Sequence, residues 1–465
     1  MAVHSSPSSV RRSPLWAWTV QPGRKGQEEA TGVRTDIRLD DLPVVQERPL
    51  EGEPAAGDPA RLEEIAEQVD RRLDLLEQVE PQPGRGSILD RLFSTGLTRR
   101  DFIRWSSMMT ATLMLPPIFE PRVARAATLS TRLPVVWINL ADCDGNTESL
   151  LRTGDPDFAT LILDTISLDY NETVMAAAGT AAEARLEEIL KKERGNYVAM
   201  FEGALPTGLN GAFLTLGSRG ETGLSLARRV ASGAKAVLAV GSCATFGGIP
   251  AAGPNPTGAK GVGEALGIPV INISGCPANA TNIVGTVLDV VMFGRMPALD
   301  RYGRPVWAYG RRIHDNCERR GHFDAGEYVL QWGDAGAEQG WCLFKMGCKG
   351  PYTFNNCSLI RWNEGTSWPI RAGHGCIGCS EPAFWDSMSP FEQPLGEKVY
   401  GSAAGIGIDA KANTVGEWAL GIAGAGIAAH AVATSLRNRL SPEWTRAGAG
   451  PDGEPKAPTQ SKEGE

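Results

Sequence analysis

The stretch LPVVWINL at residues 133–140 is a continuous apolar run of strand length, and the chain reaches Cys143 directly after it. Runs of this kind, rich in Val and Ile, are typical of strands buried on both faces. Three others follow: NYVAMFEGAL at 196–205, AKAVLAVGSC at 234–243 and IPVINISGC at 268–276. Helical patterns such as AAEARLEEILKKE lie between them, so the order predicts a parallel, doubly wound α/β sheet.

Three of these apolar runs finish at or beside a cysteine, namely Cys143, Cys243 and Cys276. The carboxyl ends of parallel strands meet at one edge of a sheet, and ligands bind at that edge. We therefore expect these three thiols to lie together.

The chain holds nine cysteines, and none precedes Cys143. An odd number is a poor disulfide framework, because one thiol would be left over. From about residue 300 to 400 the composition changes to Gly, Trp, Asn and Cys, without a long periodic segment. Such a region would be held together by bound cofactors rather than by a large core.

The other candidate ligands group by neighbourhood in the sequence. One set has four members, and the other has three: His314, Cys317, Cys342 and Cys348; then Cys357, Cys376 and Cys379. Zinc sites usually combine two CxxC-like pairs around one metal. Three sites in one chain instead indicate a series of iron–sulfur clusters, held by thiolates with an occasional His.

The N-terminal region has a different composition. Residues 1–97 are rich in Pro, Gly, Glu and Arg and are expected to be a largely disordered extension. Within it, apolar residues recur every three or four positions between about 59 and 80, which predicts an amphipathic helix. This helix would dock on the protein's own surface or on a partner. The net charge of -8 argues against a nucleic-acid partner.

Residues 98–126 have the order of an export signal. TRRDFIR is followed by a modest apolar stretch and then by Ala124-Arg125-Ala126, which is an A-x-A type cleavage site. Arg99 and Arg100 make it a twin-arginine signal, although a basic helix start is the alternative. We expect export with cleavage after Ala126, despite the long segment that comes first.

Residues 414–437 are predicted to be a transmembrane anchor. The stretch 418–436 carries no Asp, Glu, Lys or Arg and would span about 28 Å as a helix, close to a bilayer core. Arg437 and Arg439 follow, as at a cytoplasmic end, while a buried helix of a soluble domain is the alternative. Residues 438–465 are expected to form a disordered tail.

The cysteine-containing stretches resemble, in order, the cluster motifs of the small subunits of membrane-bound uptake NiFe-hydrogenases. They read GSCATFGG, SGCPANATN, IHDNCERRGHFD, GWCLFKMGCKGP, NNC and SWPIRAGHGCIGCSEPAFWD. The resemblance covers roughly residues 133–390. It implies a flavodoxin-like domain at 130–295 with a proximal cluster, and an irregular iron–sulfur domain at 296–400 with a medial and a distal cluster.

The resemblance also implies which residues bind each cluster. His314, Cys317, Cys342 and Cys348 would bind a distal 4Fe-4S cluster. Cys357, Cys376 and Cys379 would bind the medial cluster. Pro369 stands where a fourth cysteine would be needed and cannot ligate, so a 3Fe-4S cluster is expected there.

The proximal loop departs from the family pattern Cys-x-x-Cys-Ser-Glu. Asn146 occupies the second cysteine position, so Cys143, Cys243 and Cys276 lack a fourth thiol. Asp144 is the expected fourth ligand of a second 4Fe-4S cluster, with Gly145 supplying the sharp turn that it needs. An aspartate beside three cysteines is similar to the actinobacterial-type, high-oxygen-tolerance branch. Asn146, Asp142 or no fourth ligand remain alternatives.

The function that the resemblance implies is electron transfer. Hydrogen would be oxidised at a NiFe centre in a separate large subunit, and electrons would pass through three clusters to a cytochrome b or other quinone-linked membrane partner. His430, inside the apolar helix, would approach the partner's haem, and a helix-packing histidine is the alternative. The protein would work at the periplasmic face of the cell membrane. A stand-alone exported ferredoxin-like electron carrier and a structural zinc protein are the alternatives.

Overall fold

The computed structural model describes most of the chain beyond the first helix. The described residues are 45–46, 59–78, 87–94, 96, 98–113, 115–130, 132–154, 156–395, 398–403 and 406–440. Most of the predicted disordered extension and nearly all of the predicted disordered tail lie outside these residues.

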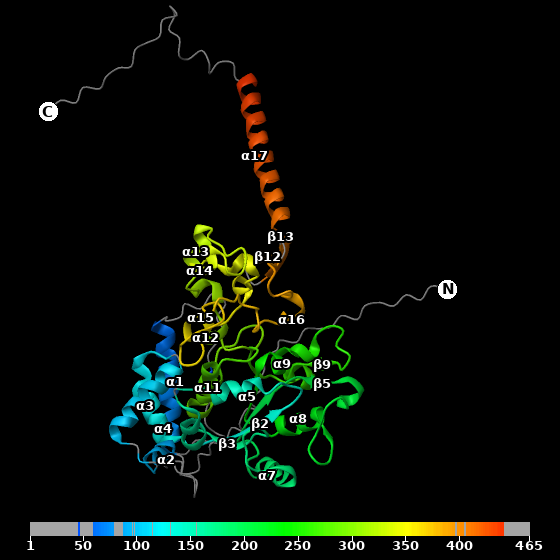
Figure 1. The fold of residues 1–465 in the computed structure, drawn as a ribbon. Coiled ribbons are helices and arrows are strands. Elements are labelled where there is room, and N and C mark those ends of the chain that lie inside the picture. Colours follow the sequence, from blue (N-terminus) through cyan, green and yellow to red (C-terminus); the bar gives the residue numbers. More distant parts are fainter. Residues whose placement is uncertain are drawn as a thin grey trace, which may run out of the picture.

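A central sheet of five parallel strands organises the molecule (Figure 1). The strands are β2 (Pro134–Asn139), β3 (Ser167–Tyr170), β4 (Val198–Glu202), β8 (Ala236–Val240) and β10 (Ile271–Ile273). Their order across the sheet is β10-β8-β4-β2-β3, with every neighbouring pair parallel. Counted along the chain, this is the 2-1-3-4-5 order of flavodoxin-like sheets. The predicted doubly wound α/β sheet is confirmed.

The two faces of the sheet are buried in two separate apolar cores. Alternate residues of a strand point to opposite faces. Accordingly, Val135 and Trp137 of β2 belong to one core, whereas Val136 and Ile138 belong to the other. All four are almost completely buried, as a continuous apolar run predicts.

Helices cover both faces. α7 (Gly179–Lys192) and α8 (Gly223–Ala231) pack on the face of Val136, where Leu186 and Val230 are buried. α7 occupies the predicted helical stretch AAEARLEEILKKE. α11 (Ala280–Leu288) packs on the opposite face.

Strand β3 was not predicted from the sequence. Its residues read SLDY, and only Tyr170 is buried. The strand lies at the edge of the sheet, and its pairing with β2 shifts register between Val135 and Val136. An edge strand is partly solvated, so it needs no continuous apolar run.

Four N-terminal helices form a layer beside α11, shown in blue and cyan in Figure 1. They are α1 (Pro59–Leu76), α2 (Ile88–Ser94), α3 (Arg99–Thr112) and α4 (Glu120–Leu129). α1 lies where the amphipathic pattern predicts a helix. Leu73 of α1 and Leu92 of α2 are fully buried in the same core as α11 and the sheet. Of the two docking alternatives for α1, the structure shows the protein's own surface.

The twin arginines lie in the first turn of a capped helix. Thr98 and Asp101 form a capping box at the start of α3, and Arg99 and Arg100 between them are exposed. Further along α3, Trp105 is buried in the core. The segment therefore folds as the alternative, a basic helix start, while its role as an export signal stays a prediction.

The predicted cleavage site lies inside α4. Ala126 is fully buried, and ion pairs tie α4 to α1: Arg122 to Asp70 at 2.7 Å, and Arg125 to Asp74 at 2.7 Å. Proteolysis favours exposed, loosely held chain. Cleavage after Ala126 therefore requires α4 to open first.

Residues 297–395 contain only short helices, and the α-helices among them have four to six residues. These are α12 (Val306–Tyr309), α13 (Arg320–Ala325), α14 (Ala335–Glu338), α15 (Cys357–Ile360) and α16 (Phe384–Ser387). The apolar clusters here are small, and one of them includes the thiols of Cys348, Cys357 and Cys376. The packing of this region thus depends on its cysteines.

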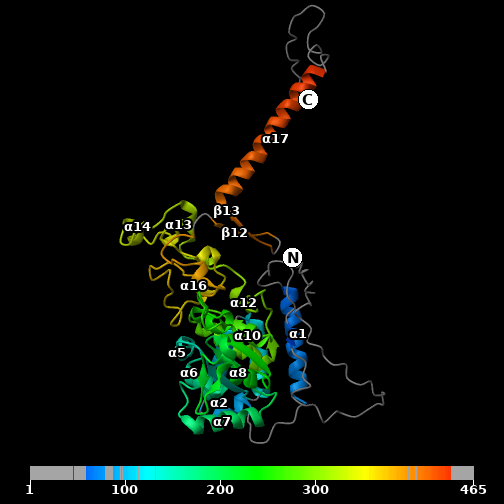
Figure 2. The ribbon, with the colours of Figure 1, turned by 90° about the vertical axis from the view of Figure 1, so that its right-hand side faces the viewer.

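The C-terminal part is a long helix. The hairpin of β12 (Lys398–Ala403) and β13 (Ile406–Lys411) leads into α17 (Ala412–Leu440), which extends away from the rest (Figures 1 and 2). In the part of the chain that the structure describes, no helix combines the length and apolar character needed to cross a membrane. The predicted transmembrane anchor at 414–437 is therefore unsupported.

The packing of α1 predicts that Leu73→Ala destabilises the full-length chain by about 2–5 kcal/mol, because a fully buried leucine leaves a cavity. Urea unfolding followed by tryptophan fluorescence measures this. Glu63→Ala, on the exposed side of α1, is the control and should change stability by less than about 0.5 kcal/mol. Equal, small effects of both substitutions would show that α1 does not belong to the core.

Candidate metal centres

The three thiols expected at the sheet edge come from the segments after β2, β8 and β10. Cys243 lies in α9 (Gly241–Phe246), which starts directly after β8 and places this thiol beside the other two loops. Burial raises the pKa of Cys243 to about 12, and the nearby thiols of Cys276 and Cys143 contribute to that rise. Cys143 and Cys276 are exposed at the surface of this chain. The structure therefore brings the three together at an open edge.

Glycine backbone closely approaches two of these sulfurs. A Cβ at Gly248 would lie 2.3 Å from Sγ of Cys243, and one at Gly145 would lie 3.2 Å from Sγ of Cys143. Gly248 also has a φ of 55°, where a side chain would be strained. The loops thus keep side chains away from both sulfurs.

A buried carboxylate holds the proximal loop. Glu202, at the end of β4, is completely buried. Its Oε1 accepts hydrogen bonds from Asn146 N at 2.7 Å and Nδ2 at 3.0 Å, and its Oε2 accepts from Thr147 N at 2.9 Å and Oγ1 at 2.7 Å. Trp137 Nε1 donates to Oε2 at 3.3 Å. Charge-assisted bonds of this kind are the strong ones, so they fix the start of α5 (Gly145–Leu151).

Asn146, at the position of the missing cysteine, is engaged at both ends of its side chain. Nδ2 donates to Glu202, and Oδ1 accepts from Ala278 N at 2.8 Å. Asn146 is also buried, and a Cβ at Gly241 would lie 2.3 Å from its Nδ2. The side chain therefore joins β4, α9 and the loop after Cys276.

The two carboxylates beside Cys143 share the donor Asn139 but otherwise have different neighbours. Asp144 Oδ1 accepts from Asn139 Nδ2 at 3.0 Å and from Thr173 Oγ1 at 2.9 Å, next to β3. Asp142 Oδ2 also accepts from Asn139 at 3.0 Å, but its charge acts on the thiol of Cys243. The sharp turn lies at Asp144 itself, with a φ of 60°, and not at Gly145 as expected.

The four predicted distal ligands line one hollow. His314, Cys317, Cys342 and Cys348 surround it together with Arg319, Arg320 and Ile370. Backbone amides point at two of the sulfurs: Arg319 N lies 3.4 Å from Cys317 Sγ, and Gly350 N lies 3.4 Å from Cys348 Sγ. Hydrogen bonds to ligand sulfurs are a standard feature of iron–sulfur sites.

His314 presents a neutral ring. It lies in the helical turn Ile313–Asn316 and packs edge-on against Phe323 at 4.5 Å between ring centres. Burial lowers the pKa of His314, and the charge of Arg320 lowers it further. The neutral imidazole is the form that binds a metal.

Two of the three medial thiols, Cys357 and Cys376, are buried, and Cys379 is half-buried. Burial raises the pKa of both Cys357 and Cys376. Gly378 N lies 3.4 Å from Cys376 Sγ. Trp368 is buried in the same apolar cluster, and its Nε1 finds no hydrogen-bond partner among the described residues. An indole N–H without an acceptor beside these thiols fits an inorganic sulfide. Pro369 is exposed, and its carbonyl accepts a hydrogen bond from His374 N at 3.0 Å.

The three sets adjoin one another through their ligands and the residues next to them. Between the medial and distal sets, Cys376 N lies 3.4 Å from Cys348 Sγ. Between the proximal and medial sets, the Ser242 hydroxyl donates to the carbonyl of Cys379 and accepts from Gly275 N at 3.1 Å, next to Cys276. The predicted ligands therefore form a continuous line from the sheet edge to His314.

The donors fit iron–sulfur chemistry. All nine cysteines are free thiols, and several accept hydrogen bonds from backbone amides. Thiolates with an occasional histidine are the usual protein ligands of such clusters. Within the described residues, no three His, Cys, Asp or Glu side chains converge closely enough to hold a single metal ion.

Three residues that shape these sites were not identified from the sequence. Glu202 gave a signal, since it ends an otherwise apolar strand and a buried charge needs partners. Trp368 and Arg304 gave none, because their importance comes from contacts with distant segments.

Two family models match the chain. Residues 309–392 match the model for the C-terminal part of the NiFe/NiFeSe hydrogenase small subunit. Residues 143–290 match the model described as NADH ubiquinone oxidoreductase, 20 Kd subunit. The boundary between them falls near the end of the sheet domain.

Known relatives match over most of their length. The chain is 53% identical over 342 residues to the quinone-reactive Ni/Fe-hydrogenase small chain of Wolinella succinogenes, covering 73% of this chain and 97% of that one. It is 45% identical over 343 residues to the uptake hydrogenase small subunit of Azotobacter vinelandii, covering 74% and 94%. A solved actinobacterial-type NiFe-hydrogenase from Ralstonia eutropha H16 aligns with a TM-score of 0.52 at 28% identity, covering 57% of this chain and 82% of that one.

The hydrogen bonds of Glu202 predict that Glu202→Ala destabilises the protein by about 3 kcal/mol or more, because several buried donors lose their acceptor. Thermal unfolding of the purified chain measures the loss. Glu264→Ala, at an exposed ion pair of 2.8 Å with Lys260, serves as control and should cost less than about 1 kcal/mol. A mild effect of Glu202→Ala would mean that the proximal loop is held by other contacts.

Proposed function

The chain belongs to the family of NiFe-hydrogenase small subunits, and from this membership we propose that it transfers electrons through three iron–sulfur clusters. It is the electron-transferring subunit of a hydrogenase that oxidises H2. The family implies iron–sulfur clusters, while their number, types and ligands are our proposal.

We assign the ligands in three sets. A proximal 4Fe-4S cluster would be held by Cys143, Cys243 and Cys276 with an aspartate. The medial 3Fe-4S and distal 4Fe-4S clusters would be held by the following residues: Cys357, Cys376 and Cys379; then His314, Cys317, Cys342 and Cys348.

The observation that carries this proposal is the contact between neighbouring ligand sets. Iron–sulfur clusters accept and release single electrons, with potentials set by ligand type, burial and hydrogen bonds to sulfur. Ser242 bridges Cys379 and the residue before Cys276, and Cys376 N lies against Cys348 Sγ, which supports an arrangement of the three sets in series. Cys357 and Cys376, in the medial set, are buried, so a cluster bound there would have little access to water.

The open proximal edge supports a place for the large subunit. Cys143 and Cys276 are exposed in this chain, at the carboxyl edge of the sheet. If the large subunit covers this edge, its NiFe centre lies next to the first ligands of the line. The hydrogenase would then be a heterodimer of large and small subunits.

We propose a membrane-linked electron acceptor at the other end. A relative of this chain is named a quinone-reactive hydrogenase. Trp418, Leu420 and Ile422 of α17 are exposed, which gives a cytochrome b or other quinone-linked partner an apolar surface. His430 is exposed on the same helix and would approach the haem of such a partner.

A stand-alone exported ferredoxin-like carrier is the weaker alternative. Such a carrier has no need of a five-stranded sheet that brings three thiols to an exposed edge. A protein that receives electrons from a partner does need such an edge. Measuring iron, labile sulfide and zinc in the purified protein would distinguish the hydrogenase subunit and the ferredoxin-like carrier, which both contain iron and sulfide, from a structural zinc protein.

We propose that the protein is exported by the twin-arginine route and works at the periplasmic face of the cell membrane. Arg99 and Arg100 support this, because both remain exposed in the folded chain. The folding of α3 and α4 thus leaves the paired charges accessible.

Replacing Arg99 and Arg100 with lysines is expected to keep the protein in the cytoplasm, since the signal requires the arginine pair. Fractionation and immunoblotting measure this, and Arg104→Lys is the matched control. N-terminal sequencing of the exported form should begin at Ala127. Normal export of the double variant would contradict the proposed route.

The medial assignment predicts that Pro369→Cys converts the 3Fe-4S cluster to a 4Fe-4S cluster, because it supplies the fourth thiolate. EPR of the oxidised complex should lose its 3Fe-type signal, and the iron content should rise by one. Arg371→Cys, an exposed cysteine two residues further on, is the control and should keep the signal. An oxidised wild-type complex without a 3Fe-type signal would contradict the assignment.

The proximal assignment predicts that Asp144→Ala loses one iron or changes its Mössbauer parameters. To bind, Asp144 must leave Asn139 and Thr173. Asp142→Ala and Asn146→Ala are measured beside it. If only Asp142→Ala alters the proximal iron, Asp142 is the ligand, consistent with the action of its charge on Cys243. If only Asn146→Ala alters the proximal iron, Asn146 is the ligand, and its side-chain amide must leave Glu202 in order to bind.

A further inference from the structure

Arg304 is a buried cation between the proximal and medial thiols. It follows the sheet domain, just before α12, and only 2% of its side chain is exposed. It is among the largest fully buried side chains that the structure describes. Arginine is almost never fully buried unless it is paired, so its partners indicate what it holds in place.

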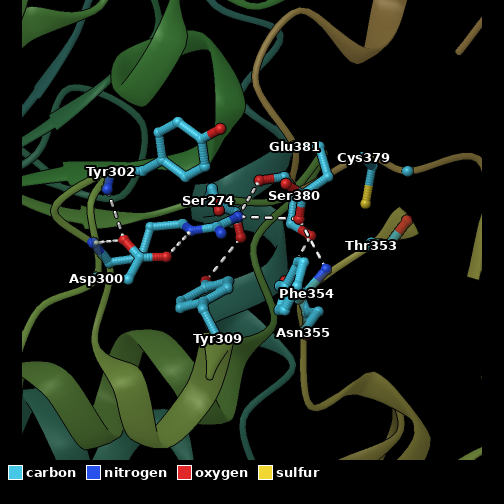
Figure 3. Close-up of polar contacts among 12 residues, drawn as sticks. Ser274, Asp300, Tyr302, Tyr309, Thr353, Phe354, Asn355, Cys379, Ser380 and Glu381 are labelled. Atoms are coloured by element: carbon cyan, nitrogen blue, oxygen red, sulfur yellow. Dashed lines mark hydrogen bonds and ion pairs between the residues drawn. The ribbon is translucent and has the colours of Figure 1, made fainter. Parts of the chain in front are cut away.

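On one side, Arg304 holds the segment after Cys379. Nη1 donates to the carbonyl of Ser380 at 2.8 Å and to Glu381 Oε1 at 3.1 Å. Glu381 Oε1 also accepts from Phe354 N at 2.7 Å, which joins the segments of Cys379 and Cys357 (Figure 3). The segments that carry two of the three medial cysteines are thus tied to one guanidinium.

On the other side, Arg304 contacts residues that hold the proximal loop. Its Nε donates to Asp300 Oδ2 at 2.8 Å, which fixes the guanidinium to its own loop. The guanidinium lies 5.2 Å from the ring centre of Tyr309. The Tyr309 hydroxyl donates to the carbonyl of Ser274 at 2.7 Å, two residues before Cys276 (Figure 3).

The two loops held in this way lie next to each other. Burial raises the pKa of Cys379 to about 11, and the nearby backbone of Cys276 opposes that rise. Ser242 strengthens the junction, because its hydroxyl donates to the carbonyl of Cys379 and accepts from Gly275 N at 3.1 Å. The two loops are therefore held together by a hydrogen-bond network, in which Arg304 holds the segment after Cys379.

The guanidinium remains charged in this network. Burial would lower the pKa of Arg304, but the carboxylates of Glu381 and Asp300 outweigh burial and raise it. Lysine could keep the charge at this position. It could not reproduce the fork, which binds Asp300 with one nitrogen and the segment after Cys379 with another.

We propose that Arg304 is a positioning residue for electron transfer from the proximal to the medial centre, because it clamps the loop of Cys379 against Cys276. This rests on the proposed function. A single electron passes from one centre to the other with no protein bond made or broken. It originates in H2, which is oxidised to two protons and two electrons in the large subunit, and it leaves to the quinone-linked acceptor.

The test compares Arg304→Lys with the wild type in the purified heterodimer, labelled with ¹⁵N in cysteine. Two quantities are measured at the medial EPR signal: the nuclear coupling of the cysteine amide, and the rate at which H2 removes the signal in freeze-quench samples. Arg185→Lys is the matched control, since Arg185 also pairs with two carboxylates, Asp169 and Glu188, but lies on α7.

We expect Arg304→Lys to keep its iron and its medial signal while losing the amide coupling and slowing the reduction. Arg185→Lys should match the wild type in both. If Arg304→Lys fails to fold, Tyr309→Phe decides, because it removes only the bond to Ser274 and introduces no unpaired charge.

If Arg304→Lys shows the amide coupling and the reduction rate of the wild type, the positioning role is wrong and the proposed function still stands. If Arg304→Lys does not fold, the same result in Tyr309→Phe leads to the same conclusion. A wild-type heterodimer with no iron–sulfur EPR signal would overturn the proposed function, and the positioning role with it.

Discussion

Burying thiols that must act as thiolates is the constraint on which this structure depends. Burial is the main cause that raises the pKa of Cys243 to about 12 and that of Cys317 to about 11, so an enclosed thiol would stay protonated without compensation. The chain compensates with backbone amides that point at sulfur, as at Cys348 and Cys376. Iron bound at these sites would supply the rest, since a coordinating thiol is deprotonated outright. The small apolar clusters beyond the sheet follow from this, because thiols form part of them.

The sheet positions the proximal ligands at one end of the series of ligand sets, and irregular backbone positions the medial and distal ligands. A parallel sheet can present several loops at one edge, but only at that edge. It therefore serves the proximal thiols alone. Further ligands need short turns that amides can approach closely, and helices longer than a turn or two would hide those amides in their own hydrogen bonds. The change from sheet to short helices near residue 296 reflects the change from one edge to an enclosed line of sites.

The parts that could be predicted are those whose signal is local. Apolar runs predicted four of the five strands, and cysteine spacing predicted a distal set that lines one hollow. Strand β3 and the buried layer of α2 to α4 could not be predicted, because they depend on what they pack against. The apolar stretch in α3 resembles a signal, yet it also suits a helix in a core. Arg304 shows the same limit, since its partners Ser380 and Glu381 are 76 and 77 residues away.

The proximal loop shows how a lost ligand position is retained structurally. A cysteine at position 146 would be fixed to the cluster by a bond to iron. Asn146 is instead fixed to the protein, by Glu202 at one end and by the amide of Ala278 at the other. Both anchors lie in segments next to the proximal thiols, so the loop keeps its place without that bond. Glu202 also accepts a hydrogen bond from the amide of Thr147, and this bond does not depend on which residue stands at position 146. The Glu202 carboxylate therefore keeps the loop in place whichever neighbouring group is the fourth ligand of the proposed proximal cluster.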